Sequence, residues 1–155
     1  MKDKYILTAE SVTAGHPDKL CDTIADSILD ACLKDDPHAR VACEVLATAG
    51  KILVAGELRT TAQPDVEAIV RQTVRQAGYD CNYNVEVRLH TQSPDIAGAV
   101  DGETLGAGDQ GIMYGYACWE TVELLPAPVV LANRITSLLT TCREEKLISG
   151  MGPDG

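Results

Sequence analysis

The chain has 155 residues, a length typical of one domain, and 45% of them are hydrophobic, which predicts a folded core rather than disorder. Its 23 acidic and 13 basic residues give a formal net charge of −10, which argues against nucleic acid or an anionic membrane as partner, because phosphate surfaces select clustered Lys and Arg. No apolar run approaches the ~20 residues of a membrane span or resembles a signal peptide, so a cytoplasmic location is expected.

Periodicity and turn residues predict six elements in the first ninety residues. In the order strand, helix, strand, strand, helix, strand, they cover residues 5–9, 17–34, 40–48, 51–60, 64–78 and 83–91. Proline and an acidic residue suit the first turn of a helix, which places the first helix start at Pro17 and Asp18. Alternation of apolar residues predicts the strands, and Ala49-Gly50 predicts a two-residue hairpin turn.

This order predicts an α+β fold, a βαββαβ unit with helices packed on one face of a mainly antiparallel sheet. The compact unit is expected over residues 11–95. Residues 92–108 are rich in Gly, Ala and Asp and lack periodicity, which predicts a mobile lid loop. Residues 109–155 would begin a second similar unit, with a strand over 112–117 and a helix from Pro126.

Six cysteines stand at positions 21, 32, 43, 81, 118 and 142, without CxxC spacing. Three of them fall on apolar stripes of the expected helices, so they are expected to be small buried residues with free thiols. The three histidines are not spaced as zinc ligands relative to any cysteine pair. We therefore expect neither a disulfide framework nor a zinc site.

The motif Gly-His-Pro-Asp-Lys at residues 15–19 lies at a helix start, where unpaired backbone N–H groups and the helix dipole favour an anion. His16 can donate to an oxyanion, Asp18 is a hard oxygen ligand suited to Mg²⁺, and Lys19 adds a positive charge. Together these residues describe a site for a metal-bound polyphosphate. From spacing alone, an ordinary proline-started helix with an acidic residue at its positive end is the alternative.

Two carboxylates lie in the expected hairpin. With a two-residue turn, Glu44 faces Ala55, and Glu57 lies on the same sheet face one diagonal step from Glu44. Two acids this close suggest a site for a cation or an ammonium group. A one-residue change in turn length would put them on opposite faces, and two solvent-facing glutamates are the alternative.

A glycine-rich segment runs from Gly106 to Ala117. Glycines on both sides of Asp109 let the backbone approach a ligand closely, and its carboxylate could accept from an adenine amine or an amino group. The segment is not the dinucleotide fingerprint, because no helix opens directly after it.

Three stretches carry a resemblance to a known family: ESVTAGHPDKLCD over 10–22, QSPDI over 92–96 and GAGDQGIMYGYA over 106–117. They resemble the signatures of methionine adenosyltransferase, also called S-adenosylmethionine synthetase, and occur in the family's order. The likeness continues through Pro126 to Pro153-Asp154. Family chains are more than twice this long, so the resemblance implies that residues 1–155 are an incomplete N-terminal part of the family's three-domain chain.

The resemblance implies an enzyme that joins ATP to methionine. The sulfur attacks the ribose C5′, and intact triphosphate leaves and is then hydrolysed. The implied cofactors are Mg²⁺, two per site, and K⁺, and the implied assembly is a homodimer with a shared active site, or a tetramer. This chain would carry part of the site and be inactive alone. The alternative is a non-catalytic short paralogue or fragment that binds nucleotide or a full-length partner.

The resemblance also implies a role for each matching residue. His16 would contact the oxygen that joins C5′ to the triphosphate, and Lys19 would bind phosphate, which makes these two the catalytic residues. Asp18 would bind Mg²⁺, and Glu44 would help bind K⁺. The implied substrate-binding residues are Glu57 and Gln92 for methionine, and His16, Lys19, Asp109 and Asp154 for ATP.

Overall fold

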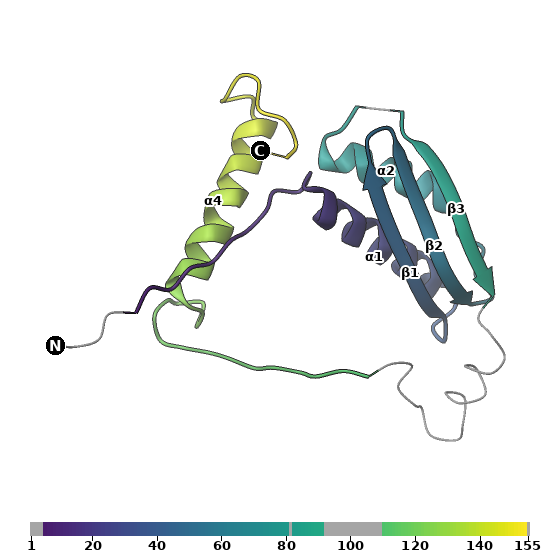
Figure 1. Cartoon of the computed structure of the whole chain (residues 1–155), viewed down its shortest axis with the longest axis horizontal. Coiled ribbons are helices and arrows are strands. Elements are labelled where there is room, and N and C mark those ends of the chain that lie inside the picture. Colours follow the sequence, from purple (N-terminus) through teal and green to yellow (C-terminus); the bar gives the residue numbers. More distant parts are fainter. Residues whose placement is uncertain (1–4, 81, 92–109, 155) are drawn as a thin grey trace. The chain divides into compact units, whose positions relative to one another are not determined.

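The computed structural model describes residues 5–80, 82–91 and 110–154. Its elements are α1 (Pro17–Asp35), β1 (Arg40–Thr48), β2 (Lys51–Arg59), α2 (Val66–Ala77), β3 (Asn84–Thr91) and α4 (Ala127–Glu144) (Figure 1). The chain divides into two units. The sheet unit is Leu20–Ile112, and the α4 unit is Met1–Lys19 together with Met113–Gly155.

The sheet has the order β1-β2-β3. β1 and β2 are antiparallel and joined by the expected two-residue turn, because Thr48 faces Lys51. β2 and β3 are parallel. The expectation of a mainly antiparallel sheet is therefore corrected to a mixed sheet. The parallel pairing is possible because α2 forms the crossover that parallel neighbours require.

The core of the sheet unit lies between the sheet and the two helices α1 and α2, which Figure 1 shows on the same side of the sheet. Its buried members come from both helices and from the central strand, and are Leu20, Ile24, Ile28, Cys32, Ile52, Val54, Val70, Val74 and Ala77. The residues of β1 alternate between half-buried and exposed, so its other face is open. The α+β class, with helices on one sheet face, is confirmed.

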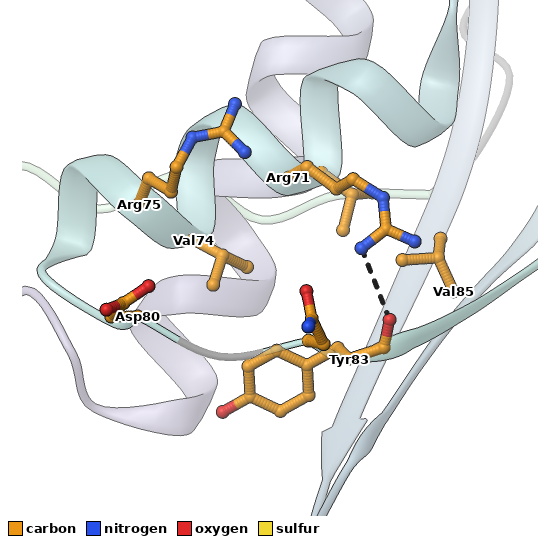
Figure 2. Close-up of a pocket in the computed structure, with 8 residues that line it drawn as sticks. Arg71, Val74, Arg75, Asp80, Tyr83 and Val85 are labelled. Atoms are coloured by element: carbon orange, nitrogen blue, oxygen red, sulfur yellow. Dashed lines mark hydrogen bonds between the residues drawn. The ribbon is translucent and has the colours of Figure 1, made fainter.

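A small cavity of about 110 Å³ lies between α2 and the beginning of β3 (Figure 2). Val70, Val74 and Val85 supply its apolar lining. The Arg71 guanidinium also lines it and donates from Nη1 to the Tyr83 carbonyl at 3.4 Å. None of the site residues expected from the sequence lines this cavity.

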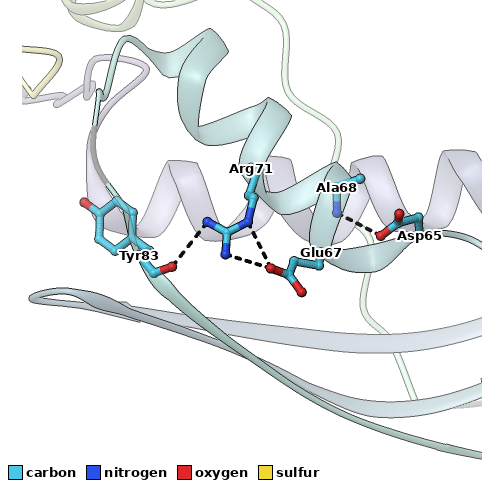
Figure 3. A network of polar contacts seen from close by, with 5 residues as sticks. All are labelled: Asp65, Glu67, Ala68, Arg71 and Tyr83. Atoms are coloured by element: carbon cyan, nitrogen blue, oxygen red, sulfur yellow. Dashed lines mark hydrogen bonds and ion pairs between the residues drawn. The ribbon is translucent and has the colours of Figure 1, made fainter.

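Side chains fix both the beginning of α2 and its link to β3 (Figure 3). Asp65 accepts a hydrogen bond from the Ala68 backbone N–H at 3.0 Å, which satisfies one of the unpaired donors of the first turn. Arg71 donates from Nε and Nη2 to one oxygen of Glu67, at 3.0 and 2.7 Å, one helical turn away. This contact holds the guanidinium where it also reaches Tyr83, the residue directly before β3.

The α4 unit contains the third expected helix, which begins at Ala127 directly after Pro126. The Ala127 backbone N–H donates to the Glu120 carboxylate at 2.9 Å, so a residue seven positions earlier caps the helix. The apolar side chains of Leu131, Ile135 and Leu138 remain 57–63% exposed.

Two expected strands are absent. Residues 5–13 and 110–118 adopt no regular secondary structure, although strands were expected over 5–9 and 112–117. Both expectations are wrong for the same physical reason. A strand persists only when a neighbouring strand pairs with its backbone groups, and the sheet contains only β1, β2 and β3 among the described residues.

Five cysteines lie in the described part of the chain, and all five are free thiols. Burial raises the pKa of Cys32, and it likewise raises the pKa of Cys43. Both thiols therefore stay protonated and serve as small core groups. Within the described residues, none of the helices has the length and apolar character needed to cross a membrane.

Candidate functional site

The motif at residues 15–19 forms the turn at the start of α1, here called the motif turn. The His16 backbone N–H donates to the Thr13 carbonyl at 3.1 Å. The His16 ring accepts at Nδ1 from the Asp18 backbone N–H at 3.2 Å, so the imidazole caps the helix. Because Nδ1 accepts this bond, the neutral ring carries its proton on Nε2, which is then the ring's hydrogen-bond donor.

The Lys19 ammonium lies close to the same turn. Its Nζ donates to the Val12 carbonyl at 2.8 Å, which folds the side chain back along the segment that precedes the motif. Lys19 and Asp18 are exposed, whereas His16 is half-buried. The motif turn therefore presents an imidazole N–H donor, an ammonium and a carboxylate within four consecutive residues.

A hydrogen-bonded joint connects the motif turn to the far end of the sequence. The Pro153 carbonyl accepts from the Gly15 backbone N–H and from the Thr13 hydroxyl, both at 3.0 Å. A side-chain Cβ at Gly15 would lie 2.4 Å from the Pro153 carbonyl carbon, so only glycine permits this approach. Asp154 follows directly and is exposed. The structure thus brings Asp154 to the turn that holds His16, Asp18 and Lys19.

Sequence reasoning had missed Thr13 and the Pro153 carbonyl as structural parts of this site. Thr13 is only 9% exposed, and its partner lies 140 positions away in the chain. No local periodicity signals such a contact. The only available signal was that both residues lie within or beside the quoted family motifs.

The two expected acids lie on the open face of the sheet, the face opposite α1 and α2. Glu44 pairs in register with Ala55, and Glu57 pairs with Ala42. Because both pairs have the same parity, the expectation that the acids share a face one diagonal step apart is confirmed. Glu44 is exposed, and Glu57 is half-buried. These acids belong to the sheet unit, whereas the motif turn and Asp154 belong to the α4 unit.

Three expectations fall outside the described residues: Gln92, Asp109 and the lid loop over 92–108.

The described residues suit a cation that takes one or two ligands from the protein and the rest from water and substrate phosphates. Among the described residues, no cluster of three or more His, Cys, Asp or Glu side chains could hold a metal ion. Mg²⁺ in proteins usually keeps several waters and is bound through one or two carboxylates together with substrate phosphates. The single exposed carboxylate of Asp18, beside a phosphate-compatible helix start, has this chemistry. The exposed oxygens of Glu44 suit a hard monovalent cation.

Comparison with known families decides the family. A model described as "S-adenosylmethionine synthetase, N-terminal domain" matches residues 4–103, and one described as "S-adenosylmethionine synthetase, central domain" matches residues 104–155. This chain belongs to the S-adenosylmethionine synthetase family. The resemblance seen in the motifs is confirmed.

Curated relatives in this family are similar over the whole chain. An S-adenosylmethionine synthase from Sulfurovum sp. (strain NBC37-1) is 47% identical over 165 residues, covering 100% of this chain and 43% of its own length. Those from Treponema denticola and Maridesulfovibrio salexigens are 44% and 47% identical, covering 98% and 99% of this chain. The chain spans about two fifths of the length of these relatives, which is 42–43%.

The two S-adenosylmethionine synthetase domain models meet between residues 103 and 104, whereas the structure groups Met1–Lys19 with Met113–Gly155. The N-terminal family model includes the motif turn, and the central-domain model includes Pro153. In the structure these two segments hydrogen-bond within the α4 unit. The motif turn therefore packs with central-domain residues.

Proposed function

We propose that this chain is the part of an S-adenosylmethionine synthase that binds the triphosphate of ATP and contributes to the methionine site. Family membership supports the reaction class. The observation that carries the proposal is the Pro153 joint, because it gathers four of the expected site residues, His16, Asp18, Lys19 and Asp154, from opposite ends of the sequence. The expected division into residues 11–95 and 109–155 stays a prediction, and the motif turn near the start of the first segment hydrogen-bonds to the end of the second.

The proposed chemistry places His16 at the leaving group. Methionine sulfur forms a bond to C5′ as the C5′–oxygen bond breaks, and the electron pair of that bond stays on the triphosphate. The His16 Nε2–H is oriented by the Nδ1 contact to Asp18 and would donate to this oxygen as its charge grows. A preplaced donor of this kind stabilises the transition state more than the ground state.

Lys19 and the start of α1 would bind the polyphosphate. The ammonium and the positive end of the helix dipole both favour an anion at this turn. When Mg²⁺ is bound, it would neutralise part of the triphosphate charge, and Asp18 is the residue that would hold it. Asp154 would contact the adenosyl group from the other side of the Pro153 joint, and Asp109 would contribute there as well.

The open sheet face would supply the methionine and K⁺ contacts. Glu57 would bind the methionine ammonium, and Glu44 would help bind K⁺, since both carboxylates lie on this face. Gln92 follows the end of β3 at Thr91 and would contact methionine.

The same face supports a homodimer with a shared active site. Leu46 is 61% exposed on this face, and the strand register places Ala42, Leu53 and Ala55 on the same face. An apolar surface that also carries acidic site residues is suited to a second copy of the chain. Sedimentation that shows a monomer at tens of micromolar, with a folded far-UV spectrum, would contradict this assembly.

The test of the proposed function joins this chain to the C-terminal remainder of the Sulfurovum relative. The 155-residue chain alone should make essentially no S-adenosylmethionine from ATP and methionine with Mg²⁺ and K⁺, because several phosphate-binding groups are expected elsewhere in a full-length relative. The joined protein should make S-adenosylmethionine and release phosphate and pyrophosphate. Turnover by the short chain near that of a full-length relative would show that the site has been misassigned.

A substitution in the joined protein tests the role of His16. His16→Ala should lower kcat by about 10²–10³, the usual cost of removing one preorganised donor. His38→Ala is the matched control, because His38 is an exposed histidine in the loop between α1 and β1. Equal activity of the two variants would overturn the assignment. ATP binding without product formation would favour the alternative, a nucleotide-binding paralogue.

A further inference from the structure

The open face of the sheet is an ordered array of side chains across three strands. The register places them in four rows, which are Thr48-Lys51-Asn84, Leu46-Leu53-Glu86, Glu44-Ala55-Arg88 and Ala42-Glu57-His90. The first row adjoins the Ala49-Gly50 turn. Acidic and basic residues are therefore neighbours on the face that carries the proposed methionine and K⁺ contacts.

Glu86 binds two of the basic side chains of this face. Lys51 Nζ lies 2.5 Å from one of its carboxylate oxygens, and Arg88 Nε lies 2.8 Å from the other. The hydrogen bond from Lys51, and then that from Arg88, hold the pKa of Glu86 below its usual range. Within the described part of the sheet, no ion pair joins Glu44 or Glu57 to a basic side chain.

Arg88 has two other carboxylates within reach. Neighbouring strands are about 4.8 Å apart and residues rise about 3.3 Å along a strand, so Glu57 is about 8 Å from Arg88 on the diagonal, measured between backbones. Glu44 is about 10 Å away in the same row, across Ala55, whose methyl group does not obstruct a long side chain. A single exposed ion pair contributes little to stability, so a small change in the local charges is enough to move Arg88 from Glu86 to Glu57 or Glu44.

We infer that Glu86 is a positioning residue that holds Arg88 away from Glu44 and Glu57 and so leaves both acids available for K⁺ and for the methionine ammonium group. The inference rests on the proposed function of these two acids. When the charge at position 86 is removed, Arg88 turns toward Glu57 and Glu44 and competes with the cations that they would bind.

The position of Arg88 can be tested in the 155-residue chain by NMR of its Nε–Hε group, identified by its loss in Arg88→Lys. In the unsubstituted chain, Glu57→Gln should leave this resonance in place, and Glu86→Gln should move it. In the Glu86→Gln background, Glu57→Gln or Glu44→Gln should then move it again. If neither second substitution moves it there, the inference is wrong. Glu86→Asp keeps the charge and should retain the original resonance, which guards against an effect of misfolding.

The consequence for substrate binding is tested in the joined protein. Glu86→Gln should raise KM for methionine about five-fold with little change in kcat, because a cation beside Glu57 opposes the substrate ammonium. The double variant Glu86→Gln with Arg88→Gln should restore KM, and Lys51→Gln should leave it unchanged as the control. An unchanged KM in active Glu86→Gln protein would overturn the inference. A joined protein that forms no product would count instead against the proposed function, and the NMR result would still decide where Arg88 lies.

Discussion

The apolar stripe on α1 is buried, whereas a stripe of similar spacing on α4 is exposed. Leu20, Ile24 and Ile28 are 0–3% exposed, because α1 from Leu20 onward packs into the core of the sheet unit. Leu131 and Leu138 on α4 are 58% and 63% exposed. Helical spacing predicts that a helix has an apolar side, but burial of that side requires a second element of matching shape.

The two units consequently hold together by different interactions. The sheet unit has a contiguous apolar core formed by two helices and the central strand. In the α4 unit, long-range hydrogen bonds join distant segments, with Ser11 bonded to Thr136 at 3.0 Å and the Pro153 carbonyl bonded to Thr13 and Gly15. A substitution that removes apolar volume should therefore lower the free energy of unfolding more in the sheet unit than in the α4 unit.

The largest expected effect comes from truncating the two stripes in turn. Ile28→Ala should lower the free energy of unfolding by about 2–5 kcal/mol, because it leaves a cavity in a closed core. Leu138→Ala should change it by less than about 0.5 kcal/mol, since the side chain is already exposed. Urea unfolding followed by circular dichroism measures both values. Similar losses for the two variants would show that α4 is covered as completely as α1.

A smaller effect should come from breaking the Pro153 joint. Gly15→Ala places a Cβ against the Pro153 carbonyl and should cost about 1–3 kcal/mol, or open the joint instead. Gly152→Ala is the matched control, because a Cβ there meets no atom within 4 Å. Hydrogen exchange of the residue 15 amide reports whether the joint is open. Protection as slow as in the unsubstituted chain would contradict the close contact.

Acid should weaken one link within the sheet unit. Asp36 accepts from the Thr61 backbone N–H at 2.8 Å, from the Thr60 hydroxyl at 3.0 Å and from the His38 backbone N–H at 3.0 Å, which ties the end of α1 to the end of β2. These hydrogen bonds, that from the Thr61 N–H first, hold the pKa of Asp36 below its ordinary value of 3.8. The carboxylate is therefore charged in the folded protein over a wider pH range than in the unfolded chain.

The sign of the pH dependence follows from that lowered pKa. Asp36 contributes stability above the unfolded pKa, and this contribution is lost as the pH falls through the folded pKa. Asp36→Asn should lower the urea midpoint at neutral pH, and the difference from the unsubstituted chain should shrink below about pH 4. Urea midpoints measured across that range test it. A difference that stays constant with pH would contradict the role of the charged form.

The smallest effect is expected on the surface of α2. Glu67→Gln weakens the ion pair with Arg71 one turn away and should cost about 0.3–0.5 kcal/mol, decreasing with added salt. Arg71→Met should cost more, because it also removes the bond to the Tyr83 carbonyl that joins α2 to β3. If the two variants are equally stable at low salt, the link to β3 contributes nothing measurable.

Much of the sheet unit could be predicted from the sequence. The first helix was expected over 17–34 and covers Pro17–Asp35, and the hairpin register followed from the two-residue turn. The parallel pairing of β3 was not predicted, because the alternation of apolar and polar residues carries no information on which strand lies beside β3 or in which direction it runs. The strands expected over 5–9 and 112–117 failed for a related reason, since their apolar pattern says nothing about whether a partner strand lies beside them.

By itself, the sequence determined the helices, the hairpin that puts Glu44 and Glu57 on one face, and the family. The helices and the hairpin depend on spacing between residues close together in the chain, where backbone geometry leaves few choices, and the family depends on short motifs. Tertiary structure alone decided that Pro153 accepts from Gly15 and Thr13, and that Arg88 binds Glu86 rather than Glu57. Such contacts depend on the path of the chain between distant segments and on competition among nearby charges, and neither leaves a periodic signal in the sequence.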